Sequence, residues 1–463
     1  MGCQPGLLAL CSRRAALPLV ALAGAPVAAL SGASDAALAA ASTTIAQGGH
    51  RAVQQWNPEE LQSLVDTLAQ EVEEIRGRRF REAVDVLFAD RGTLARLARE
   101  RDADSGLLGA FGDGRAAKMF GMLAADVDLR RLAADVHADL DAPSAVYQEG
   151  GGSFFLLDAQ DSGRARLEMV RQLTQALDDQ HHDLAALRRG AARDRDALFA
   201  FQAIVRGSTF AIARAWQERH ARAAADDTAP VDALLLSPSL HGAPPFVWRP
   251  ILAAYLRGHA FLRRTNVPSL MLQGASNADI DRAFESPPAS TEQLLHPVKY
   301  WKASRADEPR RLCADTGGLP ADWRALEEDT LGELFVGILV EPFEERDGLR
   351  CTSPQDLVRE PLTCEAAAGW GGDRYVLLAS GGASVLHASF LWDDPRDAAE
   401  FHAALSAVEA GIRASIAALA GDGASGTRIA LGDRPDEVLF TSWAGVKAET
   451  ALRVADGVRF VEE

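Results

Sequence analysis

Two long amphipathic helices in the middle of the chain constrain its fold more than any other feature of the sequence. From about Arg164 to Arg189, apolar residues recur at the three- and four-residue spacing of one helix face. A second helical pattern runs from about Asp194 to Arg219. The middle of the chain is therefore predicted to be mainly helical.

Shorter patterns place further elements on either side of these helices. The Asn-Pro-Glu-Glu sequence at 57–60 is typical of a helix start, and the helix is expected to reach about Ile75. Other helices are predicted at 93–101, 116–140, 251–264, 277–284, 395–419 and 444–455. Strands are predicted at 84–88, 153–157, 375–379, 384–391, 427–431 and 437–442.

A polar stretch containing glycine and proline, residues 303–325, is a plausible boundary between two parts of the chain. We expect it to connect a helical domain, residues 57–302, to a separate C-terminal α+β domain, residues 326–463.

The N-terminus differs in composition from the rest of the chain. Arg13 and Arg14 precede an apolar run over 15–30, and small residues follow. This order predicts an export signal over 1–36, followed by a linker rich in small residues over 37–56. We therefore expect an exported protein, periplasmic or extracellular.

Composition narrows the classes of partner. The 65 acidic residues outnumber the 48 basic ones, so a nucleic-acid backbone would be repelled and small or peptidic partners are favoured. The cysteines outside the export signal, Cys313, Cys351 and Cys364, show no metal-ligand spacing. In an oxidising compartment Cys351 and Cys364 could close a short loop.

The most informative segment is the first amphipathic helix. Residues 171–184 read R-Q-L-T-Q-A-L-D-D-Q-H-H-D-L. This resembles the active-site helix of a family of exported zincin-like metallopeptidases of the gluzincin type, which reads H-E-L-T-H-A-L-x-D-Q-H-F-D-L. The matching residues include Asp179, Gln180, His181 and Asp183.

Other segments are similar to the same family, in the same order along the chain. Residues 287–300 read P-P-A-S-T-E-Q-L-L-H-P-V-K-Y and match a family P-P-x-S-T-E-Q-x-L-H-P-x-K-Y segment, including Glu292 and His296. Residues 203–207, 369–374 and 397–401 resemble three shorter family segments. The resemblance implies an α+β protein with a zincin-like fold, mostly helical with a small sheet, before the C-terminal domain.

The resemblance also locates a zinc site, and the residues at its positions cannot build one. Zinc hydrolysis uses two imidazoles one helical turn apart, a third ligand from another element and a glutamate base. Here Arg171 and Gln175 stand at the first two ligand positions, Gln172 at the base position and Arg206 at the third ligand position. Arginine offers only hydrogen-bond donors, and a glutamine amide is a poor zinc ligand. No zinc and no other cofactor is expected.

Several roles remain open for these residues. Arg171, Gln172, Gln175 and Arg206 could be structural replacements, or the two arginines could bind a carboxylate or a peptide end. A relocated metal site on the 164–189 helix is geometrically possible, because Asp179 and His182 lie three residues apart. His181 and His296 are more typical of structural histidines. Tyr255 resembles part of a family helix and is expected to pack in the core.

Three hypotheses of function follow. The first is a catalytically inactive, exported metallopeptidase-like protein that serves as a binding or structural component of the cell envelope or secreted milieu. The second is a hydrolase with a rebuilt metal site at Asp179 and His182. The third is a pseudo-subunit that pairs with an active homologue.

Overall fold

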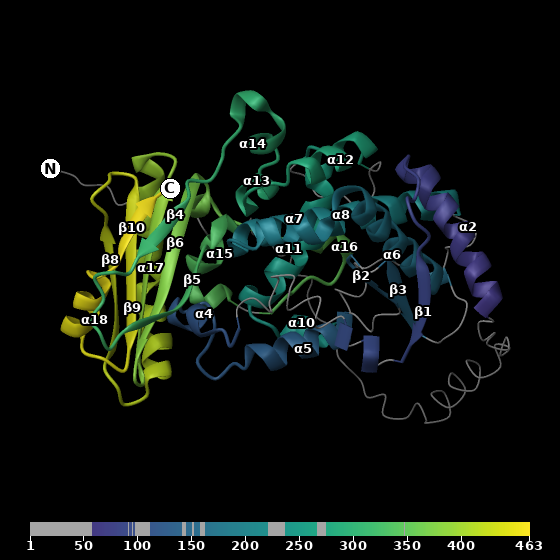
Figure 1. The fold of residues 1–463 in the computed structure, drawn as a ribbon. Helices are drawn as coiled ribbons and strands as arrows, with labels where there is room; N and C mark the ends of the chain where they lie inside the picture. The colour runs from purple at the N-terminus through teal and green to yellow at the C-terminus, as the bar shows by residue number, and fades with distance from the viewer. Residues whose placement is uncertain are drawn as a thin grey trace, which may run out of the picture. The chain divides into compact units, whose positions relative to one another are not determined.

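The longest helix of the helical part, α8 (Arg195–Arg219), begins at a capped N-terminus, as its sequence predicts. The computed structural model describes residues 58–90, 92–94, 96–97, 112–140, 145–150, 152–157, 163–220, 237–265, 275–346 and 348–463 (Figure 1). The predicted export signal, the linker and part of the helix expected at 93–101 lie outside these residues. The described residues belong to one unit, Trp56–Glu463.

Helices α8 (Arg195–Arg219) and α11 (Pro245–Leu262) form the centre of the helical part. The Asp194 side chain caps α8 by accepting from the N–H of Ala197 at 2.6 Å. The two helices approach so closely that a Cβ on Gly258 would stand 1.8 Å from the main-chain oxygen of Ala203. Only glycine fits at this crossing.

Three helices differ from their predicted bounds. The expected 164–189 helix is two helices, α6 (Gly163–His182) and α7 (Leu184–Ala191), because Asp183 adopts a left-handed φ of 50°. The expected 116–140 helix is likewise two, α4 (Arg115–Met119) and α5 (Leu129–Leu140). Helix α11 begins before its predicted start at Ile251 and contains Pro250 inside it.

A three-stranded sheet lies beside α6. Strand β1 (Asp85–Ala89) is parallel to β3 (Ser153–Leu157), and β2 (Ala145–Gln148) is antiparallel to β3 at the other edge. Strand β2 was not predicted, and it packs on α6.

The remaining elements of the helical part are shorter or peripheral. They are α2 (Pro58–Arg76), α10 (Pro238–Gly242), α12 (Asn277–Glu285), α13 (Thr291–Leu295), α14 (Val298–Trp301) and the 3-10 turn η2 (Ala303–Arg305). Helix α2 begins as its Asn-Pro-Glu-Glu sequence predicts, and α12 has the predicted N-terminus.

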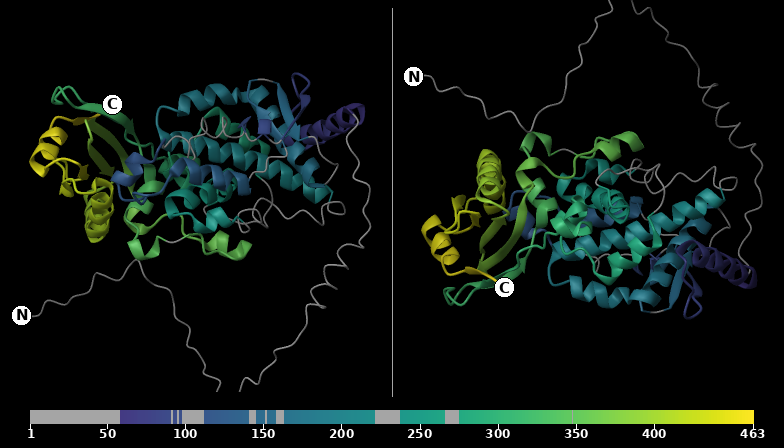
Figure 2. Two further views of the ribbon diagram at one scale, coloured as in Figure 1. Left: turned by 90° about the horizontal axis from the view of Figure 1, so that it is seen from below. Right: turned by 90° about the horizontal axis from the view of Figure 1, so that it is seen from above.

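A five-stranded antiparallel sheet forms most of the C-terminal part, with the strand order β5-β6-β7-β9-β8. Helix α17 (Pro395–Ala420) packs on β8 and β9, and Figure 2 shows it from two further sides. The strands are β5 (Arg324–Asp329), β6 (Trp370–Ser380), β7 (Ala383–Trp392), β8 (Ser425–Leu431) and β9 (Glu437–Ala444). The predicted hairpin, the long helix and both later strands are confirmed.

Smaller elements complete this part. Strand β4 (Leu312–Asp315) pairs antiparallel with the last strand, β10 (Arg459–Glu462). The helices are α15 (Gly332–Leu339), α16 (Pro354–Arg359) and α18 (Ala448–Ala455), with 3-10 turns η3 (Phe343–Glu345) and η4 (Glu365–Ala367). Among the described residues, α17 is long and apolar enough to cross a membrane by length and composition alone.

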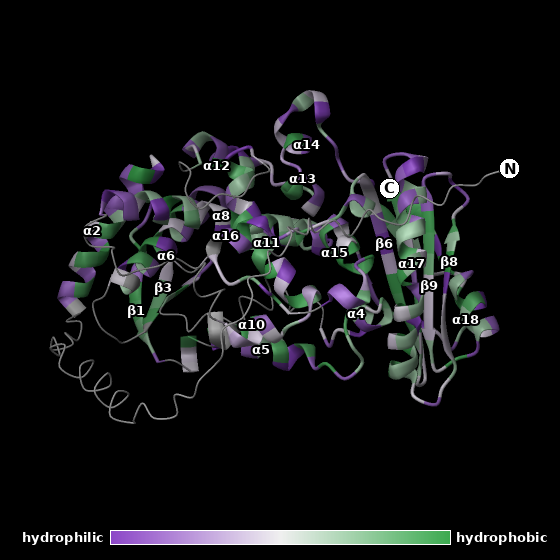
Figure 3. Ribbon diagram, turned by 180° about the vertical axis from the view of Figure 1, so that it is seen from behind, coloured by the Kyte–Doolittle hydropathy of each residue, from purple (hydrophilic) through white to green (hydrophobic). Residues whose placement is uncertain are grey.

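The fold is α+β, as predicted, but residues 303–325 do not separate two cores. They contribute β4 and the first residues of β5. One hydrophobic core runs from Leu61 on α2 to Phe440 on β9. Figure 3 shows hydrophobic residues, in green, along β6 and β9. The expected connecting segment is therefore part of the packed structure.

The cysteines in the described residues are free thiols, so no bridge joins Cys351 to Cys364. The buried Cys351 thiol lies 3.6 Å from Oε2 of Glu360. Burial and this carboxylate raise the pKa of Cys351 to about 12, which keeps the thiol protonated and unreactive.

Candidate functional site

The position of the expected catalytic base on α6 is filled by a buried glutamine that holds the neighbouring strand. The Gln172 side chain is 5% exposed. Its Oε1 accepts the main-chain N–H of Tyr147, on β2, at 2.6 Å. Its Nε2 donates to Oε1 of Glu168 at 2.6 Å. Both ends of the amide are used, so this side chain joins α6 to the edge of the small sheet.

The two expected ligand positions on α6 are also engaged. Arg171 forms an ion pair with Glu168 at 3.0 Å, one turn earlier on the same helix. Gln175 donates to Glu149 at 3.0 Å, in the turn after β2. Arg188 on α7 donates to the same Glu149 carboxylate from Nε at 2.9 Å. The positive charge of Arg171 is therefore already opposed by a carboxylate.

The third expected ligand position, Arg206 on α8, faces another helix. Its guanidinium donates to the hydroxyl of Tyr255 on α11 at 3.0 Å and lies 5.0 Å from the centre of that ring. Helices α6 and α8 do pack together. However, Arg171 and Gln175 bond to α6 and the turn after β2, whereas Arg206 bonds to α11. Binding of a carboxylate or a peptide end by the two arginines stays a prediction.

The residues of α6 that match the resembled family are used in local structure. Asp179 accepts from the Tyr147 hydroxyl, the Gly150 N–H and the Leu184 N–H, at 2.7–2.8 Å. Burial, and then the charge of Asp179, raise the pKa of Tyr147 above its ordinary range. Asp183 caps α7 by accepting from the N–H of Ala186 at 2.9 Å.

The next residues on α6 bind the segment that follows α2. Gln180 accepts the Arg81 N–H at 2.8 Å and donates to the Glu82 carbonyl at 2.9 Å. His181 lies with Nε2 2.8 Å from the Arg79 carbonyl. These contacts join α6 to the segment that follows α2, and the structural role of His181 stays a prediction.

A relocated metal site at Asp179 and His182 finds no support in this geometry. Both oxygens of Asp179 already accept hydrogen bonds from three donors. His182 instead points at Asp281, 3.3 Å away, and packs on the Phe284 ring. Burial lowers the pKa of His182. The two side chains do not converge on a common point.

The donor set at the zinc positions does not fit zinc. Two guanidiniums and two amides stand where imidazoles and carboxylates are needed, and the amides are held by Tyr147, Glu168 and Glu149. We derive no metal chemistry for this site.

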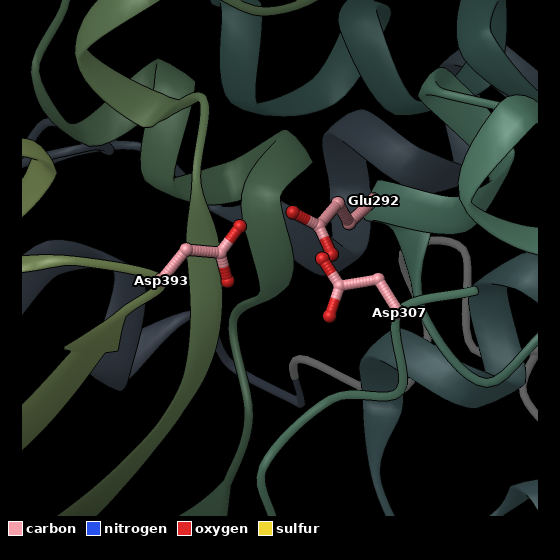
Figure 4. A group of neighbouring side chains, drawn as sticks. All are labelled: Glu292, Asp307 and Asp393. Atoms are coloured by element: carbon pink, nitrogen blue, oxygen red, sulfur yellow. The ribbon is translucent and has the colours of Figure 1, made fainter. Parts of the chain in front are cut away.

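A second cluster surrounds the other family-like segment, on α13 and α14. Ser290 caps α13 by accepting from the N–H of Gln293. Glu292 on α13 is 1% exposed, and its Oε1 lies 2.5 Å from the Nζ of Lys299 on α14. The same Nζ lies 2.6 Å from Asp307 and 3.0 Å from Asp393, which follows β7. Figure 4 shows the three carboxylates pointing toward one another.

His296 connects this segment to α15. Its Nε2 lies 2.9 Å from Oε1 of Glu333, and the Thr363 hydroxyl donates to that same oxygen at 3.0 Å. Glu333 is completely buried, and its Oε2 has no hydrogen-bond partner among the described residues. His296 therefore does more than end the turn after the Pro-Pro sequence, because it holds a buried carboxylate of the next part of the chain.

Sequence reasoning identified Glu292 and His296 through the resemblance but missed Asp307, Asp393 and Glu333. The segment carries one usable signal, because Glu292 and Lys299 are opposite charges and no other Asp, Glu, Lys or Arg lies within 287–300. Asp307 lies 8 positions after Lys299, outside the matched segment, and Asp393 lies 94 positions away, where no local pattern indicates it.

Comparison with known families gives one match. Residues 322–450 match a family described as a domain of unknown function, DUF8575. This range takes in β5 to β9 and α17 and ends at the start of α18. No curated protein and no solved structure matches the chain.

Proposed function

We propose that this protein is a catalytically inactive relative of the zincin-like metallopeptidases that acts as an exported binding or structural component. The observation that carries the proposal is the use of all four replaced positions. Arg171, Gln172 and Gln175 pair with Glu168, Tyr147 and Glu149, while Arg206 pairs with Tyr255 on α11.

One of these contacts also occupies a main-chain donor at the edge of the small sheet. The Tyr147 N–H of edge strand β2 is bound by a side chain of the protein itself, so it is not available to an added peptide strand. A peptidase binds its substrate in extended form beside its catalytic helix. Here Gln172, at the expected base position, accepts the Tyr147 N–H at the outer edge of β2. The export signal predicted over 1–36 supports the exported part of this proposal, with the protein in the envelope or outside the cell.

The direct test is the zinc content and peptidase activity of the purified mature protein. We expect less than roughly a tenth of an equivalent of zinc, because no imidazole or carboxylate trio converges at the old site. A chelator should leave the melting temperature unchanged. Stoichiometric zinc, or chelator-sensitive hydrolysis of peptides, would overturn the proposal.

A second experiment tests the resemblance itself. The quadruple variant Arg171→His, Gln172→Glu, Gln175→His and Arg206→Glu restores the expected ligands and base. If the fold is zincin-like, this variant should bind close to one equivalent of zinc, and a control with Arg171 unchanged should not. No zinc in the quadruple variant would remove the zincin assignment while leaving the absence of activity in the wild type intact.

A further inference from the structure

The cluster around Lys299 has the geometry of a cation site built from oxygen ligands. One oxygen from each of Glu292, Asp307 and Asp393 lies within 4.8 Å of the others. The Lys299 ammonium stands among them, 2.5, 2.6 and 3.0 Å from the three carboxylates. Three carboxylate oxygens converging on one cation is the arrangement with which proteins hold hard divalent ions.

The carboxylates outnumber the positive charge that they surround. Burial raises the pKa of Glu292 to about 8 although Lys299 lowers it, and the nearby charges of Glu333 and Asp393 raise it further. Burial also raises the pKa of Asp393. Glu333 is a further buried carboxylate nearby, but it bonds His296 and Thr363 and is not one of the three converging groups. The cluster therefore depends on the one cation inside it.

The cluster joins one continuous segment to a distant one, because Glu292 and Asp307 lie 7 and 8 positions from Lys299 and Asp393 lies 94 positions from it. Glu292 and Lys299 belong to α13 and α14, Asp307 follows η2, and Asp393 follows β7 of the C-terminal sheet. The main chain supports the same connection, since the Asp307 N–H donates to the Lys299 carbonyl at 2.9 Å. Gln293 donates to the Asp307 carbonyl at 2.6 Å.

We propose that Lys299 is an internal cation that occupies a three-carboxylate site in place of a metal ion, and that it fastens α13 and α14 to the end of β7. When the ammonium is removed, a divalent cation that prefers oxygen ligands binds the same three carboxylates. This inference does not rest on the absence of zinc at α6, because the two sites share no residue.

The test compares wild type with Lys299→Met, which keeps the apolar stem and removes the charge. Each protein is stripped with a chelator, and its melting temperature is measured with and without Ca²⁺, Mg²⁺ or Mn²⁺. The variant should melt lower than wild type in chelator and regain at least about 2 °C in one of the ions. Wild type should show no such gain. Lys302→Met, at an exposed lysine three residues on, is the control and should change neither value.

A double variant keeps the proposal testable if Lys299→Met does not fold. Glu292→Gln with Lys299→Met replaces both partners of the Glu292–Lys299 pair by neutral side chains and should be more stable than Lys299→Met alone. It should also lose the response to divalent ions. The proposal is overturned if Lys299→Met has the same melting temperature as wild type, or if neither variant folds. It is also overturned if a divalent ion raises the melting temperature of wild type by displacing the ammonium.

Discussion

The face of α6 and the Lys299 cluster both come from segments that resemble one family, yet they are built differently. On α6 the side chains at the expected zinc positions are amides and one arginine, and each bonds to a neighbour on the same helix, on β2 or in the turn after β2. Around Lys299 the residues are charged, and a local segment that carries Glu292 and Asp307 meets the distant Asp393. The difference teaches that a substitution on α6 removes one or two contacts to a neighbour. In the cluster, by contrast, replacing Lys299 leaves three carboxylates without the positive charge that they share.

The largest difference between the two regions is expected when Glu292 is replaced by glutamine. This change should alter how the free energy of unfolding depends on pH. The folded-state pKa of about 8 lies above the ordinary 4.5, so the folded chain holds this proton more tightly than the unfolded chain does. The resulting stabilisation is complete below about pH 4.5 and is lost as the pH rises through 8. It amounts to a few kcal/mol at most.

Urea unfolding at several pH values from 4.5 to 8 measures this effect. Wild type should lose stability across the window, and Glu292→Gln should show a flatter profile. The groups facing Glu292 are Lys299, Asp307, Asp393 and Glu333. Because the pKa of Asp393 is also raised, the stability of Glu292→Gln should still fall slightly with rising pH at the acidic end of the window. The same slope in both proteins would contradict the assignment.

A smaller effect is expected at Gln172. Replacing it by alanine leaves the buried N–H of Tyr147 without its acceptor, which costs about 1–3 kcal/mol in unfolding free energy. Chemical denaturation checks the value. Gln62→Ala on α2, where the glutamine is exposed and bonds only to exposed Asp66, should cost less than about 0.5 kcal/mol. Equal losses in the two variants would show that Gln172 does not hold β2.

The smallest effect is expected at Arg171. Its ion pair with Glu168 is about one-quarter exposed on each side, and such pairs contribute less than about 1 kcal/mol. Arg171→Ala should therefore leave the urea midpoint nearly unchanged, and moderate salt should reduce the difference further. A loss as large as that at Gln172 would mean that this face carries buried charge, and the comparison between the two regions would fail.

The sequence was sufficient for elements whose signals are local. The helical pattern of α8 and the Asn-Pro-Glu-Glu sequence at α2 gave their starts correctly, because a helix face and a start sequence are both read within a few residues. The break at Asp183 was missed because a left-handed aspartate leaves the apolar spacing on both sides intact.

Features that depend on distant partners could not be predicted. Strand β2 is short, and it is held by Gln172 and Asp179 as much as by its own residues. The site followed the same rule. Local spacing placed Gln172 and Gln175 on one helix face, but their partners Tyr147 and Glu149 lie more than 20 residues earlier. Asp307 and Asp393 had no signal at all.

The pairing of β4 with β10 has a consequence for synthesis of the chain. Asp315 and Arg459 face each other across this small sheet and are 144 positions apart. At about 5–20 residues per second, β4 leaves the ribosome on the order of 10 seconds before its partner exists. During that interval an edge of β4 has no strand beside it. Nascent chains stalled before the last strand should therefore be the form of this protein most prone to capture by chaperones or to aggregation.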